Sequence, residues 1–358
     1  MSLEMSKKSK KFSKGRGAVT LPTQQPGATG SQATTQAQTT ASEKQQLIPL
    51  IQALEQARGN RVMVYWLTDL ARISEAVVPS LYDQLSAIGH QEVLDLLLFT
   101  RGGDTEAPWR IVTLMREFCN RFAVLVPYRA HSAGTVLAMG ADEIVMTPMG
   151  VLSPIDPSRT HPLLPRREGA TEAEPISVQD MRHAMTFIRE TAKPSEETTY
   201  TPDAMAQIVT ALFDKIHPLA IGAIEQSYAL SKLIATRCLS THMTSPDDKD
   251  SIDKIVNRLC DDYKSHAYPI CREEARDIGL KVIYAPPSVD QAMMDLAKFY
   301  MARDIGFPKT TVRPSPGQTF KLYIAWLDSI NKQMRVEQDT LVEKDNQARP
   351  VGDRWIEY

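Results

Sequence analysis

The feature that most constrains the fold is a nearly unbroken apolar run, EVLDLLLFT at residues 92–100. A strand that is apolar on both sides is typical of a parallel sheet whose two faces are covered. Similar apolar or β-branched runs occur at residues 61–68, 122–128 and 143–147. Stretches with helical periodicity separate the runs, at about residues 73–88, 105–120 and 132–140. This alternation predicts an α/β protein with a mainly parallel sheet.

The composition divides the chain into a tail, a main domain and an extension. Residues 1–41 begin with six basic residues among the first 16 and continue as a stretch rich in Thr, Gln, Gly and Ala. Such a segment has almost nothing to bury, so we predict a disordered tail, or alternatively a tether for an acidic partner or a nucleic acid. Helical periodicity begins near Ser42, and we assign residues 42–287 to the main domain. We expect residues 288–358 to form a helical extension that ends in an extended tail.

Charge and cysteine usage exclude several classes of protein. The 41 Lys and Arg residues nearly balance the 43 Asp and Glu residues, which argues against a dedicated nucleic-acid-binding protein. The four cysteines include no C-x-x-C pair, so we expect neither a disulfide framework nor a zinc site, and a reducing, cytoplasmic compartment fits best. No apolar run approaches the roughly 18–20 residues that a membrane span needs.

A glycine pair follows the predicted buried strand, in FTRGGDTEA at residues 99–107. Gly102 and Gly103 allow a sharp turn that can point amide N–H groups into a cleft at the carboxyl end of the strand. Such amides can stabilise an oxyanion or bind a phosphate, although a glycine pair after a strand is also common in an ordinary turn. Arg101 and Asp104 flank the turn and could fix it by a salt bridge or bind substrate.

A serine opens the helix expected after the next strand, in PYRAHSAGTVLAMGADEIVM at residues 127–146. Ser132 lies at the N-terminus of that small-residue helix, where free amides and the helix dipole favour a developing negative charge. Ala133 and Gly134 let another backbone come close, and the Ala133 amide could donate to the same oxyanion as the glycine turn. The alternative is that Ser132 only caps the helix, which is the commonest role of a serine at that position.

The glycine turn and the serine segment together resemble a known pattern. The Clp protease proteolytic subunit and signal peptide peptidase A, which share a fold with crotonase, carry a Gly-Gly turn after one strand and a nucleophilic serine in a small-residue helix after the next. An A-D-x-I strand follows, as at residues 141–144 here, and later an E-A-x-x-x-G-L segment, as at residues 274–280. Over roughly residues 45–285 the chain is similar to the serine dehydrogenase proteinase family, which resembles signal peptide peptidase A without its membrane anchor.

This resemblance implies a Clp/crotonase-like spiral of β-β-α units with added helices. It implies a serine peptidase in which Ser132 attacks a carbonyl and forms an acyl-enzyme, while the amides of Gly102, Gly103 and Ala133 hold the oxyanion. The implied substrate is a peptide or a protein, and neither a metal nor an organic cofactor is required. Because members of this fold commonly form rings or trimers, a homo-oligomer is implied as well.

The general base departs from these families. Signal peptide peptidase A relatives use a lysine, but none occurs here between Ser132 and Lys193, which lies in a polar stretch where we expect it to be solvated. This sequence has Asp156 where the Clp family has its histidine, and His266 near the position of that family's aspartate. Because triads are defined by geometry and not by order, we predict a triad of Ser132, His266 and Asp156. The other candidate bases are a lysine, His217 and His131, although the adjacent residues His131 and Ser132 are expected to project to different sides. His161 lies in a Pro-rich stretch and could be a lid residue.

Two other functions stay open at this point. A crotonase-like enzyme would use the amide pair to polarise an acyl-CoA thioester and would need no serine nucleophile. A catalytically inactive assembly protein of the same fold is compatible with the missing lysine and the displaced histidine. Labelling by a fluorophosphonate and thermal stabilisation by acyl-CoA would separate these functions from a serine peptidase.

Overall fold

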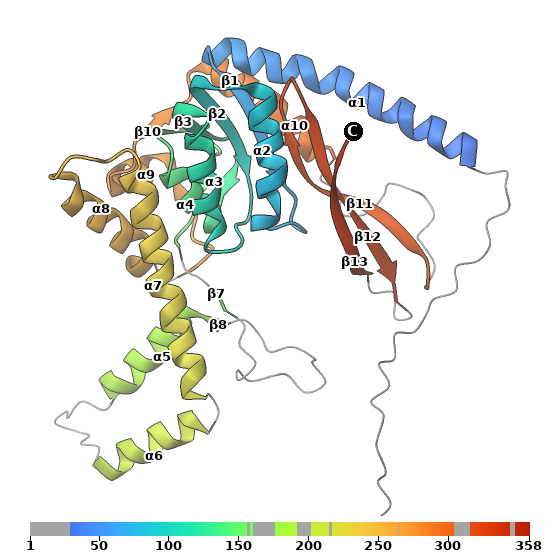
Figure 1. Cartoon of the computed structure of the whole chain (residues 1–358). Helices are drawn as coiled ribbons and strands as arrows, with labels where there is room; N and C mark the ends of the chain where they lie inside the picture. Colours follow the sequence, from blue (N-terminus) through green and yellow to red (C-terminus); the bar gives the residue numbers. More distant parts are fainter. Residues whose placement is uncertain are drawn as a thin grey trace, which may run out of the picture. The chain divides into compact units, whose positions relative to one another are not determined.

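A central sheet of eight strands organises the part of the chain that carries the predicted site (Figure 1). The computed structural model describes residues 29–155, 158–159, 176–191, 202–214, 217–263, 265–303, 316–343 and 348–358. The chain forms two compact units, residues 1–44 and residues 45–358, and the sheet belongs to the second unit.

Five strands form the parallel half of the sheet, in the order β10-β5-β3-β2-β1. They are β1 (Arg61–Leu67), β2 (Gln91–Phe99), β3 (Cys119–Val126), β5 (Glu143–Met146) and β10 (Val282–Tyr284). The apolar run at residues 92–100 forms β2, and this strand is buried from Leu94 to Phe99. The predicted α/β class with a mainly parallel sheet is therefore confirmed.

Helices cover both faces of the sheet and bury two separate apolar cores. On one face lie α2 (Val78–Ile88), α3 (Ala107–Arg116), α4 (Ala133–Met139) and α7 (Pro218–Ser240). The other face is covered by the part of α1 (Thr29–Arg58) that begins at Leu47 and by α10 (Pro287–Met301). Alternate residues of β1 enter the two cores: Met63 and Tyr65 face the first, and Val64 and Trp66 face the second. This two-sided burial explains why the strands lack a polar side.

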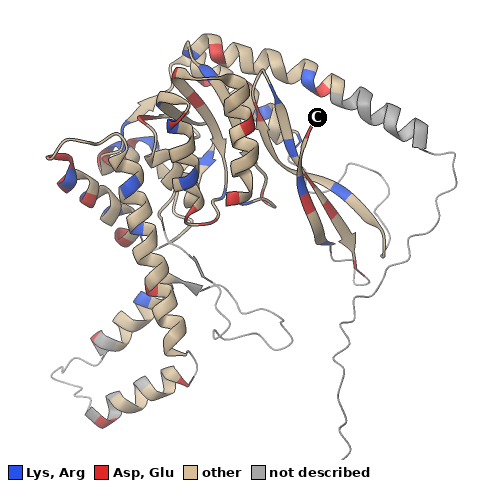
Figure 2. Ribbon diagram, in the orientation of Figure 1, with Lys and Arg blue, Asp and Glu red and all other residues tan. Residues whose placement is uncertain are grey.

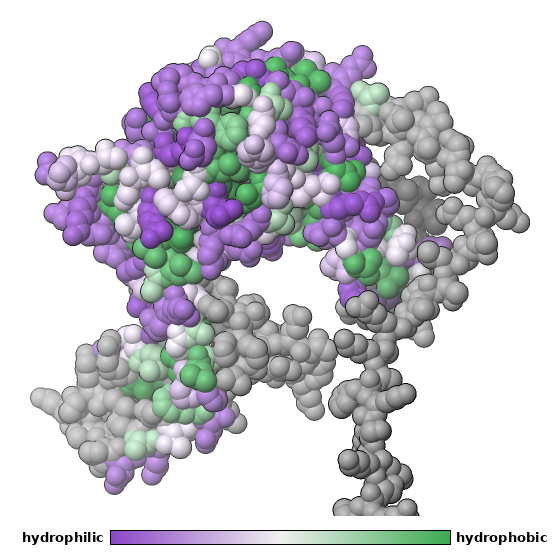
Figure 3. Space-filling view, viewed as in Figure 1, coloured by the Kyte–Doolittle hydropathy of each residue, from purple (hydrophilic) through white to green (hydrophobic). Residues whose placement is uncertain are grey.

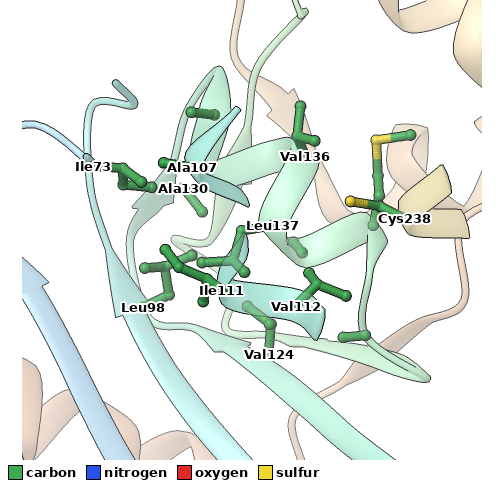
Figure 4. Close-up of a cluster of buried hydrophobic side chains, with 14 of the residues drawn as sticks. Ile73, Leu98, Ala107, Ile111, Val112, Val124, Ala130, Val136, Leu137 and Cys238 are labelled. Carbon is green, nitrogen blue, oxygen red and sulfur yellow. The ribbon is translucent and has the colours of Figure 1, made fainter. Parts of the chain in front are cut away.

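The first core fixes α3 and α4 against β2 and β3 (Figure 4). Leu98 of β2 and Val124 of β3 lie among Ile111 of α3 and Val136 and Leu137 of α4, and all five side chains are buried. A second, small sheet of β4 (Arg129–Ala130), β6 (Val151–Leu152) and β9 (Ile270–Cys271) adjoins α4. The N-terminus of α4 is thus held from two sides.

The remaining helices lie mainly around α7. They are α5 (Val178–Thr191), α6 (Pro202–Phe213), α8 (Asp248–Asn257), a π-helical turn at Arg258–Asp262, and α9 (Arg272–Ile278). Pro218, the predicted joint, opens α7. The ribbon in Figure 2 shows charged residues on the helices, on the loops and on the antiparallel strands near the C-terminus. The space-filling view in Figure 3 shows apolar surface over α5–α7, where Phe187 is the most exposed large apolar residue among those described.

Two terminal segments differ from the sequence-based expectation. The first helix begins at Thr29 and not near Ser42, and residues 1–28 of the predicted tail lie outside the described residues. In the predicted helical extension, only α10 is helical among the described residues. It is followed by β11 (Thr319–Asp328), β12 (Gln333–Val342) and β13 (Ala348–Glu357), which extend the sheet from β1 in antiparallel order. The helical prediction fails there because β11 alternates apolar and polar residues and pairs with β1.

Two absences concern the described residues alone. Among the described helices, none is both long and apolar enough to cross a bilayer. Within the same part of the chain, His, Cys, Asp and Glu side chains form no group of three that could hold a metal ion.

Candidate active site

The glycine turn is held by backbone bonds on both sides. Beyond β2, the N–H of Thr100 donates to Arg129 O (3.1 Å), and the N–H of His131 donates to Thr100 O (3.2 Å). Gly102 has φ +103°, a conformation that L side chains rarely adopt, and its N–H donates to Thr100 Oγ1 at 2.9 Å. The turn therefore leaves the sheet at a fixed angle, which a residue with a side chain could not easily reproduce.

Gly103 forms a parallel bridge with Ile73. The N–H of Ile73 donates to Gly102 O and the N–H of Asp104 donates to Ile73 O, both at 2.9 Å. A Cβ atom on Gly103 would lie only 2.0 Å from Ile73 O, so the bridge requires glycine. Within the described part of the chain, the N–H of Gly103 itself donates no hydrogen bond.

Ser132 occupies a strained backbone turn at the start of α4. Its φ and ψ are 51° and −114°, and it is the only non-glycine residue with positive φ among those described. The N–H of Gly134 donates to His131 O at 2.8 Å, which closes a turn with Ser132 at its first central position. The geometry is that of a type II′ turn, in which this position favours glycine. The strain is typical of functional sites.

A buried network holds this turn from behind. The N–H of Ser132 donates to Ser153 Oγ at 2.7 Å, and Ser153 is fully buried. Ser153 Oγ in turn donates to Pro154 O at 3.0 Å, and the N–H of Ser153 donates to Thr135 Oγ1 at 3.1 Å. Sequence reasoning did not single out Ser153, because a serine after a short strand carries no distinguishing pattern.

The structure brings the glycine turn and the serine turn into direct contact. A Cβ atom on Gly102 would lie 2.8 Å from Ser132 Cβ and 3.2 Å from the Ala133 nitrogen. A Cβ atom on Gly134 would lie 2.4 Å from Thr100 Cγ2, so the predicted close approach at Gly134 occurs. Like that of Gly103, the N–H of Ala133 donates no hydrogen bond to any described residue. Two amides that have no partner among the described residues thus lie close to Ser132, where the two turns meet.

Ser132, Gly103 and Ala133 line one cavity of about 700 Å³. His266, in the turn that precedes β9, lines the same cavity, as do His131 and three arginines. Ser132 is half-buried, so it is not enclosed in the apolar core, and His266 is exposed. The cavity lining therefore brings together a serine, two imidazoles and two residues whose amides donate to no described residue.

Three other candidate residues, Asp156, His161 and Lys193, lie outside the described residues. His217 is the N-cap of α7, where its Nδ1 accepts from the N–H of Leu219 at 3.2 Å, and it does not line the cavity. Of His217 and His266, only His266 lines the same cavity as Ser132.

His131 lies in the cavity although its adjacency to Ser132 argued against it. Burial, together with the charges of Arg129, His266 and Arg101, lowers the pKa of His131 to about 4. Its Nε2 atom is buried and has no hydrogen-bond partner among the described residues. His131 is therefore neutral at physiological pH.

Comparison with known proteins agrees with this geometry. Residues 44–201 match the family model described as a ClpP-like SDH-type serine proteinase. The match includes both the glycine turn and Ser132. It confirms the resemblance to the serine dehydrogenase proteinase family over this segment.

Individual relatives are more distant. A protein of Methanocaldococcus jannaschii described as uncharacterized is 24% identical over 205 residues, which are 57% of this chain and 58% of that protein. A second such protein of the same organism is 36% identical over 64 residues, 18% of this chain and 22% of its own length. The chain thus spans less than two thirds of the length of these curated relatives. Two mutant structures of the 1510-N membrane-bound stomatin-specific protease, one in complex with a substrate peptide, are 16% identical with a TM-score of 0.32. They cover 60% and 63% of this chain, and the match covers 75% of each of them.

Proposed function

We propose that this protein is a serine peptidase whose nucleophile is Ser132. The observation that carries the proposal is the contact of the two turns, in which Gly102 lies directly against Ser132 and Ala133. The amides of Gly103 and Ala133, which donate to no described residue, belong to the wall of the cavity that Ser132 also lines. A hydroxyl on a strained turn beside two such donors is the arrangement that acyl transfer requires.

The proposed reaction passes through an acyl-enzyme. Ser132 Oγ attacks the carbonyl carbon of the scissile bond while a general base removes its proton. The carbonyl oxygen becomes an oxyanion, which accepts hydrogen bonds from the N–H groups of Gly103 and Ala133. The protonated base gives its proton to the leaving amine, and water then hydrolyses the ester by the reverse sequence. Losing one oxyanion donor costs on the order of 10²–10³ in turnover in comparable sites.

Gly102 has a different role in this proposal from that of Gly103. Its N–H already donates to Thr100 Oγ1, so it is not free to bind an oxyanion. Its lack of a side chain allows the glycine turn to touch Ser132, where a Cβ atom would meet His131 O at 2.9 Å. We therefore retain Gly103 and Ala133 as the donors.

We propose His266 as the general base and Asp156 as its acidic partner. His266 lines the cavity with Ser132. His131 does so too, but a group with a pKa of about 4 is a weak base at neutral pH. The homo-oligomer, the cytoplasmic location and an acidic partner for the basic tail stay predictions.

Peptide hydrolysis by a small set of variants tests the proposal. Labelled casein or a mixture of fluorogenic peptides is incubated with the wild type and with Ser132→Ala, His266→Gln, Asp156→Asn and, as a control, His217→Gln. We expect no hydrolysis by Ser132→Ala, a loss of about 10²–10⁴ for His266→Gln, and wild-type rates for His217→Gln. Full activity of Ser132→Ala would overturn the assignment. Stabilisation by acyl-CoA without hydrolysis would favour a crotonase-like enzyme, and neither response would favour an inactive assembly protein.

A further inference from the structure

Three arginines line the cavity beside Ser132: Arg72, Arg101 and Arg129. They come from separate segments, namely the loop after β1, the glycine turn and β4. One nearby carboxylate, Asp69, serves two of them: its Oδ1 pairs with Arg101 Nε at 2.8 Å and also with Arg129. Among the described residues, Asp69 is therefore the only carboxylate that pairs with any of the three arginines, and it pairs with two of them.

Arg129 is held as a rigid part of the wall. Its side chain is only 15% exposed and lies over the rings of Phe99 and Tyr128, at 4.6 and 5.7 Å from their centroids. Its Nε atom is buried and makes no hydrogen bond with a described residue. Such stacking orients a guanidinium group and reduces the entropy that binding costs.

Arg72 keeps donors available for a ligand. Its Nη1 atom donates to the backbone oxygens of Asp69 and Ala71, both at 2.9 Å, and it pairs with no carboxylate in the described part of the chain. Backbone carbonyls position the group without neutralising its charge. Arg72 and Arg101 are both exposed to solvent, so an incoming anion can reach them.

The charge balance of the cavity remains positive. Asp104 is the only acidic residue among those described that lines it. Burial and the nearby carboxylates of Glu106 and Glu75 raise the pKa of Asp104 above its usual value, but three arginines still outnumber this one carboxylate in the lining. The charges of Arg129 and Arg101 both act on His131, next to Ser132, and lower its pKa. The positive potential therefore extends to the proposed nucleophile.

We propose that this arginine cluster, Arg72, Arg101 and Arg129, is a subsite for a carboxylate of the substrate, either an acidic side chain near the scissile bond or a free C-terminus. A guanidinium fork matches the planar carboxylate and can bind it through two parallel hydrogen bonds. The subsite rests on the proposed function, because it assumes that the Ser132 cavity receives a peptide.

Binding to a catalytically silent protein tests the subsite separately from catalysis. Full-length Ser132→Ala is titrated with two matched pairs of fluorescent peptides, followed by anisotropy at low salt. One pair differs by Glu against Gln in the chain, with both C-termini amidated, and the other differs by a free against an amidated C-terminus. The carboxylate member of one pair should bind about tenfold more tightly or better, since hydrogen bonds to charged groups contribute this much. The pair that shows the preference identifies the source of the carboxylate.

The preference should depend on the cluster and not on overall charge. Arg101→Gln and Arg72→Gln, each added to Ser132→Ala, should reduce it, and raised salt should weaken it. A substitution of Arg129 is unsuitable for the test. Because Arg129 packs on Phe99, a loss of binding could come from a folding defect as well as from the lost charge. Arg110→Gln is the matched control: Arg110 is exposed on α3, carries the same charge and does not line the cavity, so the preference should persist.

The outcomes separate the two proposals. Equal binding within both pairs, or a preference unchanged in both Arg101→Gln and Arg72→Gln, would overturn the subsite. Hydrolysis by the wild type without any carboxylate preference would likewise overturn the subsite and leave the peptidase standing. Selective binding by Ser132→Ala without hydrolysis by the wild type would support the subsite and contradict the peptidase.

Discussion

The positive φ of Ser132 makes an unusual prediction about stability. At 51° the backbone is in a region that strains every residue except glycine, at a cost of about 1–3 kcal/mol. Ser132→Gly removes both the hydroxyl and the strain, whereas Ser132→Ala removes the hydroxyl alone. Relative to alanine, glycine also lowers the free energy of unfolding by about 0.4–1 kcal/mol, because it increases the entropy of the unfolded chain. The glycine variant should therefore be more stable than the alanine variant, by up to about 2.6 kcal/mol.

Urea unfolding measures this difference, with equal slopes required for the comparison. The control is the same pair of substitutions at Ser74, the N-cap of a short 3₁₀ helix, which has φ −148° and makes no capping bond through its side chain. There glycine relieves no strain, so Ser74→Gly should be equal to Ser74→Ala or less stable. If glycine is no more favourable relative to alanine at position 132 than it is at position 74, the Ser132 turn is not strained and the argument for a functional turn loses its physical basis.

Three further perturbations test other parts of the structure. Gly103→Ala must break the bridge to Ile73. It should lower the free energy of unfolding by about 2–4 kcal/mol in a denaturation assay, and it should slow labelling by a fluorophosphonate. An unchanged free energy and an unchanged labelling rate would contradict the bridge. Arg58→Met should cost about 3–5 kcal/mol by the same assay, because it leaves the fully buried Asp95 without its cationic partner, and a neutral effect would contradict that pairing. Burial raises the pKa of Asp328 to about 7, against about 4 in an unfolded chain. The folded protein therefore holds the Asp328 proton more tightly than the unfolded chain, and the stability that this proton contributes is lost as the pH rises from about 4 to about 7. Urea titrations across this range should show that Asp328→Asn removes that part of the slope, and identical slopes would refute the assignment.

The parallel half of the fold could be predicted because its signal is local. A run such as residues 92–100 has few alternatives to a strand buried on both faces, and β2 occupies that position. The charged Asp95 within it is accommodated by Arg58 of α1, at 2.7 Å, and by Asn60. This pairing joins residues that no sequence pattern connects.

The antiparallel half could not be predicted in the same way. β11 carries a strand signal, since Phe320, Leu322 and Ile324 alternate with other residues. Its stability, however, comes from pairing with β1, from a distant part of the chain, and non-local pairing leaves no mark in a short window. The predicted helix at this end is limited, among described residues, to α10.

At the site, the sequence indicated which segments would meet but not how they are held. The glycine turn and Ser132 do meet, because parallel strands end at the same edge of a sheet. No sequence pattern indicates the positive φ of Ser132. At this turn His131 lines the same cavity as Ser132, although the adjacency of the two residues argued against it. Ser153 was missed because its role depends on a backbone N–H that lies opposite it only after folding.

The central claim is that Ser132 Oγ and the amides of Gly103 and Ala133 act on one carbonyl group. A crystal structure of the protein treated with a fluorophosphonate tests it most directly. The account predicts phosphorus bonded to Ser132 Oγ, with the phosphonyl oxygen about 2.7–3.1 Å from both amide nitrogens. A bond to another residue, or a phosphonyl oxygen turned away from both amides, would contradict it.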